Sequence, residues 1–79
     1  ASKPAEMSPS RRYAVATGFL QRDLPELALA EYQSLLRDAP EFAQRDAARY
    51  GLAVAAYRLK QYDTAAEALA PLTDAASFD

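Results

Sequence analysis

Two pairs of acidic residues come closest to a catalytic arrangement in this chain. Asp23 and Glu26 form one pair, and Asp63 and Glu67 form the other; carboxylates at such spacing can serve acid–base chemistry or hold a hard cation. Each pair also falls where a helix is expected to begin, and there acids cap backbone amides and complement the helix dipole. The chain has no histidine and no cysteine, so the commonest general base and the thiolate metal ligands are absent. We therefore interpret both pairs as helix-terminal acids and predict a non-enzymatic protein with no metal site and no cofactor.

The glycines and arginines do not indicate a phosphate or nucleic-acid site. Gly18 and Gly51 stand outside any glycine-rich phosphate loop, and we expect both to mark close helix packing. Acids are interleaved with the arginines and the formal net charge is −2, so no basic field favours a polyanion. We expect Arg12 and Arg49 to form solvated ion pairs whose stems cover apolar surface, and we predict no nucleic-acid partner.

A row of large apolar side chains is the more informative pattern. Tyr50, Val54 and Tyr57 recur at i, i+4 and i+7, which places them on one face of a helix. The opposite face carries a second apolar stripe, made of Leu52, Ala53, Ala56 and Leu59. A neighbouring hairpin needs only one of these faces, so the tyrosines either contact a ligand or pack between helices with their hydroxyls in solvent.

Helices are the elements expected to position these residues. Ser8 and Pro9 are typical of a helix start, and apolar spacing predicts helices over residues 9–22, 24–38 and 41–60, followed by a fourth after a turn at 61–63. No stretch alternates as a strand would. The connections are short, so consecutive helices should lie antiparallel.

Local signals set the expected helix ends. The segment from Asp23 to Glu26 matches an acidic cap for the second helix, and Glu41 with Arg45 would form a favourable pair in the first turns of the third. Pro71 removes an amide and clashes with the preceding turn. We therefore expect the fourth helix to end near Ala70 or to kink at Pro71.

Two stretches of the chain are copies of one another. The segment Arg12-Tyr13-Ala14-Val15-Ala16 reappears as Arg49-Tyr50-Gly51-Leu52-Ala53, an offset of 37 because 49 − 12 = 37. A period in this range with helical spacing indicates helical hairpins that stack to bury their apolar faces. The predicted fold is all-α: a short right-handed α-solenoid of four helices. We expect a disordered leader at 1–7, one hairpin at 8–42 and a second at 43–79 with an irregular C-terminal tail.

This pattern resembles the tetratricopeptide repeat family. In the first unit the matching positions are Val15, Ala16, Phe19, Ala28, Tyr32, Leu35 and Pro40, and in the second they are Leu52, Ala53, Tyr62, Asp63, Ala65, Leu69 and Leu72. The unit here is three residues longer than the family norm, and Ser77 stands at the closing proline. The resemblance implies a protein-binding scaffold.

In the resembled family, the first helix of each hairpin lines a concave groove. The matching positions are Tyr13, Thr17, Leu20 and Gln21 in the first unit and Tyr50, Val54, Tyr57 and Arg58 in the second. Such a groove would be aromatic and nearly uncharged. It lacks the lysine and asparagine set that clamps a C-terminal carboxylate in some family members, so that activity is not predicted.

The expected partner is a protein or peptide, or further repeats of the same parent chain; the alternative is a structural self-association domain that forms a homodimer. No apolar run is long enough to cross a bilayer, so no membrane insertion is expected. Arginine makes up most of the basic residues, which favours a GC-rich bacterial origin, and we expect a soluble protein of cytoplasm or periplasm. The alanine-rich last helix has hardly a polar side, so we expect it to need a neighbour: a following repeat, a second copy, or Phe78 folding back.

Overall fold

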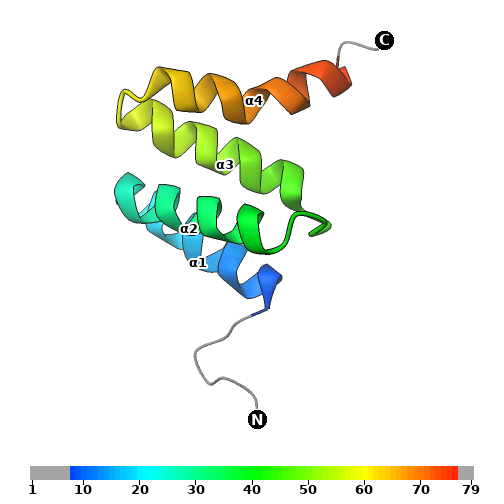
Figure 1. Ribbon diagram of the computed structural model, residues 1–79. Helices are drawn as coiled ribbons and strands as arrows, with labels where there is room; N and C mark the ends of the chain where they lie inside the picture. The colour runs from blue at the N-terminus through cyan, green and yellow to red at the C-terminus, as the bar shows by residue number, and fades with distance from the viewer. Residues whose placement is uncertain (1–7, 77–79) are drawn as a thin grey trace.

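The computed structural model describes residues 8–76, and these form two stacked helical hairpins (Figure 1). The first hairpin consists of α1 (Pro9–Gln21) and α2 (Pro25–Asp38), and the second of α3 (Arg45–Arg58) and α4 (Tyr62–Ala76). Consecutive helices run antiparallel (Figure 1) and pack on one another, and α1 also contacts α3. The described residues contain no strand. This confirms the predicted all-α stack of hairpins; the predicted leader at 1–7 and the residues 77–79, including Ser77 and Phe78, lie outside the described part.

The 37-residue repeat is visible in the backbone of the two hairpin turns. Asp23 and Lys60, which are 37 positions apart, both adopt a left-handed conformation with φ of 64°. The amide of Leu24 donates to the Phe19 carbonyl at 2.8 Å, and the amide of Gln61 donates to the Ala56 carbonyl at the same distance. These are the bonds of a Schellman C-cap, which satisfies carbonyls left over at a helix end.

The expected acidic cap at Asp23 is therefore wrong. Leu24 is the N-cap of α2 and no side chain caps this helix. Asp23 lies one residue before that position, in the left-handed turn that ends α1. The expected cap at Ser8 is confirmed, since its hydroxyl accepts from the Arg11 amide at 3.2 Å. Pro9 follows at the first helical position, where the missing amide costs nothing.

Two other helix boundaries differ from expectation. The third helix begins at Arg45 and not near Glu41, because the amides of Phe42 and Arg45 bond to carbonyls three residues back and form turns. Arg45 donates to the Phe42 carbonyl at 3.4 Å instead of forming the expected first-turn pair with Glu41. The fourth helix does not end near Ala70 but continues through Pro71 to Ala76. Pro71 is exposed, so water can reach the carbonyl that the proline leaves without a donor.

Tyr32 is the centre of the core. Its side chain is 1% exposed, and its hydroxyl shares a 2.8 Å hydrogen bond with the hydroxyl of Thr17 on α1. Burial raises the pKa of the Tyr32 phenol above its ordinary value, and the bond to Thr17 partly opposes that rise. The ring also lies over Gly51, where an added Cβ would fall 2.6 Å from the Tyr32 hydroxyl oxygen. One side chain of α2 thereby joins α1, α2 and α3.

The two glycines differ in their surroundings. Close packing at Gly51 is confirmed by its contact with Tyr32. Close packing at Gly18 is wrong, because, apart from the adjacent backbone of its own helix, no atom lies within 4 Å of the position where its Cβ would stand. Arg12 forms the expected ion pair: it reaches Asp38 at 3.2 Å and donates to the Ser34 hydroxyl at 2.6 Å, which fastens α1 to α2. The ion pair expected of Arg49 is not formed within the described residues.

The turn at Lys60 offers a stability test. A side chain with a Cβ is disfavoured in the left-handed region, whereas glycine is not. We expect Lys60→Gly to stabilise the chain by about 0.5–1 kcal/mol, after allowance for the greater freedom of glycine in the unfolded state. Lys60→Ala keeps the Cβ and serves as the matched control. Thermal unfolding should show a higher melting temperature for Lys60→Gly only; equal melting of the two variants would contradict the strain at this turn.

Candidate binding groove

A shallow hollow of about 400 Å³ lies where α3 meets α4. We call it the α3–α4 groove. It is lined by Tyr50, Ala53, Val54, Tyr57, Arg58, Ala65 and Leu69. Arg58 is the single charged residue in this lining, so the groove presents an apolar surface with one cation at its edge.

The two tyrosines form the wall of the groove. Tyr50 is 62% exposed and Tyr57 is 65% exposed, although each carries a large apolar ring. Tyr57 is held in place by Tyr62 of α4, whose ring meets it edge-on with the centroids 5.3 Å apart. The face that the sequence places opposite these tyrosines is the one that enters the core: Leu52, Ala53 and Ala56 are all buried.

The floor of the groove is made of alanines. Ala53 of α3 is 3% exposed and Ala65 of α4 is 7% exposed. Small side chains at a helix crossing let the two backbones approach closely and leave the space above them unfilled. The large residues on either side, Val54 on α3 and Leu69 on α4, then stand as flanks of a hollow.

Arg58 joins the edge of the groove to the first hairpin. Its Nη1 donates to the Leu20 carbonyl at the end of α1 at 3.2 Å, and it lies 3.6 Å from an Asp23 carboxylate oxygen. A cation at a helix C-terminus satisfies an orphan carbonyl and complements the dipole. Both partners of the ion pair are substantially exposed, at 45% and 86%, so the pair orients the guanidinium more than it stabilises the fold.

The structure separates the predicted site residues by hairpin. Tyr50, Val54, Tyr57 and Arg58 come together in the α3–α4 groove, whereas the four predicted residues of the first unit do not line it. Tyr13 is half-buried, with its ring 6.1 Å from that of Tyr32 and 6.3 Å from that of Phe42. Thr17 is bonded to Tyr32. Leu20 packs against the core, and Gln21 is exposed.

The sequence analysis did not predict three of the residues that line the groove. Ala53 was assigned to the buried stripe, which it also belongs to, and Ala65 and Leu69 lie on the other helix. Helical spacing on α3 identifies the tyrosine face but does not indicate which face of α4 crosses it. The small residue at 65, repeated from Ala28, was the available signal for a close crossing.

Chemistry-bearing clusters are not found elsewhere in the described residues. Within 8–76, no three acidic, histidine or cysteine side chains gather in a way that could hold a metal ion. No helix of that range is long and apolar enough to cross a bilayer. The buried side-chain nitrogens and oxygens of the described residues all have hydrogen-bond partners.

Comparisons with known proteins returned no match, whether the chain was compared with family models, with curated proteins or with solved structures. The tetratricopeptide resemblance therefore rests on the residues of the chain itself.

Proposed function

We propose that this chain is a non-enzymatic binding module, built from two tetratricopeptide-like hairpins, that takes an apolar segment of a protein or peptide into the α3–α4 groove. The observation that carries the proposal is the exposure of Tyr50 and Tyr57 beside an apolar hollow of about 400 Å³. The core does not need these two rings. Interfaces concentrate their binding energy in tyrosine, tryptophan and arginine, and the groove presents two of these residue types.

The residues that line the groove indicate the kind of ligand that fits it. An apolar or aromatic side chain would fill the space over Ala53 and Ala65, and the tyrosine rings would cover its sides. The tyrosine hydroxyls and Arg58 stand at the edge, where they can bond to the carbonyls or carboxylates of a bound segment. We expect the preferred ligand to be a short segment with one large apolar side chain flanked by hydrogen-bond acceptors.

Peptide selection and substitution test this function. Ligands are selected from a displayed random-peptide library on the intact chain, and their affinity is measured by fluorescence anisotropy. We expect Tyr50→Ala and Tyr57→Ala together to weaken binding by at least about a hundredfold, since each truncation of a central interface residue costs about 2 kcal/mol. Circular dichroism should show unchanged helicity, because both rings are largely exposed in the unliganded chain.

Two controls make the result specific. The double variant Tyr50→Phe with Tyr57→Phe keeps the rings and should retain most of the affinity. Leu27→Ala removes an apolar side chain that is 48% exposed on α2, away from the groove, and should bind as the native chain does. Full binding by the double alanine variant would refute the groove, and loss of helicity in that variant would show that the rings belong to the core.

A further inference from the structure

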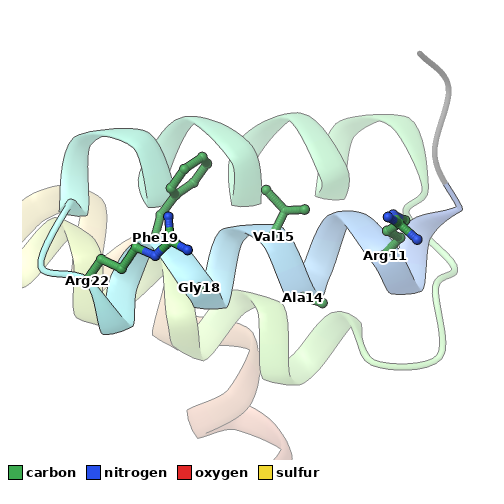
Figure 2. Close-up of a pocket in the computed structure, with 6 residues that line it drawn as sticks. All are labelled: Arg11, Ala14, Val15, Gly18, Phe19 and Arg22. Atoms are coloured by element: carbon green, nitrogen blue, oxygen red, sulfur yellow. The ribbon is translucent and has the colours of Figure 1, made fainter. Parts of the chain in front are cut away.

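The outer side of α1 carries a second hollow, of about 460 Å³. We call it the α1 hollow. Figure 2 shows its six residues along one side of the helix, with Arg11 and Arg22 toward the two ends. They are Arg11, Ala14, Val15, Gly18, Phe19 and Arg22. Gly18 lies within it, with no atom near its missing Cβ.

The same positions on α3 are covered by protein. Adding 37 to the residues of the α1 hollow gives Ala48, Gly51, Leu52, Ala55, Ala56 and Leu59. The first five are buried and Leu59 is half-buried. Gly51 lies directly under Tyr32 of α2, which identifies α2 as the element that covers this face. The α1 hollow is therefore the repeat equivalent of the surface that α2 occupies on α3.

The other end of the stack presents the complementary face. Among the described helices α4 contacts only α3, whereas its repeat equivalent α2 contacts both α1 and α3. Leu29 of α2 is buried, but its equivalent Ala66 on α4 is exposed. Ala70 shares that side of α4 at helical spacing and is exposed too. The outer face of α4 thus corresponds to the face of α2 that packs on α3.

The charges of the terminal helices are opposite. The segment of α1 contains Arg11 and Arg12 and no acid; the segment of α4 contains Asp63 and Glu67 and no base. Within the described residues, Arg11, Arg22, Asp63 and Glu67 form no ion pair. The contact between α2 and α3 inside each chain pairs charges in the same way. There α2 carries three acids and one base, and α3 carries three arginines and one acid.

We propose that copies of this chain associate head to tail, with the outer face of α4 in one copy packed into the α1 hollow of the next. A second copy is the indicated occupant because the chain itself carries both halves of the interface, with matching charge. The contact would repeat the α2–α3 packing already present inside each chain. Such a contact uses two different surfaces, so association continues beyond a dimer instead of stopping at two copies.

The first test is the mass of the intact 79-residue chain as a function of concentration, measured by sedimentation equilibrium. We expect the weight-average mass to rise past that of a dimer as the concentration increases. A monomer at all concentrations would overturn the proposal, as would a species that stops at two copies.

Two blocking variants then identify the surfaces. Gly18→Glu places a bulky acid in the α1 hollow, against the acidic α4 of the next copy. Ala66→Arg places a bulky base on the outer face of α4, against Arg11 and Arg22. Both positions are open in the single chain, so circular dichroism should show that each variant folds. We expect each variant alone to associate roughly a hundredfold more weakly than the native chain.

The mixture of the two variants is decisive. Gly18→Glu retains a native α4 and Ala66→Arg retains a native α1, so equal amounts should restore association through that native pair of faces and form a one-to-one complex. Symmetric pairing predicts otherwise: if α4 faces pair with each other, Gly18→Glu alone dimerises, and if α1 faces pair, Ala66→Arg alone dimerises. Either result, or a mixture of folded variants that stays monomeric while the native chain associates, would overturn head-to-tail association.

Discussion

Gly51→Ala is expected to destabilise the chain by about 1–3 kcal/mol, whereas Gly18→Ala is expected to stabilise it by about 0.5–1 kcal/mol. At position 51 the new methyl group would enter the ring of Tyr32, and that ring cannot move aside because it is buried and bonded to Thr17. At position 18 the methyl group meets no atom within 4 Å beyond the adjacent backbone of its own helix, so only the gain in helix propensity remains. Thermal and urea unfolding, carried out at concentrations where the chain is monomeric, measure both effects.

A double-mutant cycle isolates the cause at Gly51. Tyr32→Leu removes the ring and destabilises the chain by itself, but it also makes room for the methyl group. Gly51→Ala should therefore cost much less in the Tyr32→Leu background than in the native one, because residues in contact are not additive. Equal costs in both backgrounds would show that the Tyr32 ring is not what excludes a side chain at 51.

These glycines show what the sequence could and could not predict. Both lie inside a helix, and the sequence gives the same expectation of close packing for each. Only the number of neighbours distinguishes them: α3 lies between α2 and α4, whereas α1 has one open side. Repetition predicts the shape of a unit reliably, but the burial of a residue depends on where its unit stands in the stack.

The helices could be predicted from the sequence, whereas some of their boundaries could not. Apolar spacing and the 37-residue offset predicted four helices and their order because those signals repeat over many residues. The start of α3 at Arg45 was missed because Glu41 and Arg45 have the spacing of a helical pair, while Phe42 is drawn toward Tyr13 by a contact between distant segments. The left-handed turns at Asp23 and Lys60 were missed because neither carries the glycine that usually marks them.

The sequence predicted the α3 side of the α3–α4 groove but not its α4 side. Spacing along one helix is enough to align Tyr50, Val54 and Tyr57 on one face. The residues contributed by α4 depend on how two helices cross, which is decided by the sizes of the side chains at the crossing. Ala65 carried that information as a repeat of Ala28, so equivalent small residues are the sequence feature that points to the second wall of such a groove.

Ala28→Leu is expected to destabilise the chain by about 1–3 kcal/mol, because Ala28 of α2 is fully buried and a leucine there would force the neighbouring helices apart. For a domain of this size that cost lowers the melting temperature by about 4–8 °C per kcal/mol. Ala30→Leu is the matched control: it adds the same side chain at an exposed position of the same helix, and leucine is nearly as good a helix former as alanine. An unchanged melting temperature for Ala28→Leu would mean that the helices of the first hairpin can separate without loss of stability. The inference that small residues at 28 and 65 mark close helix crossings would then be wrong for both hairpins.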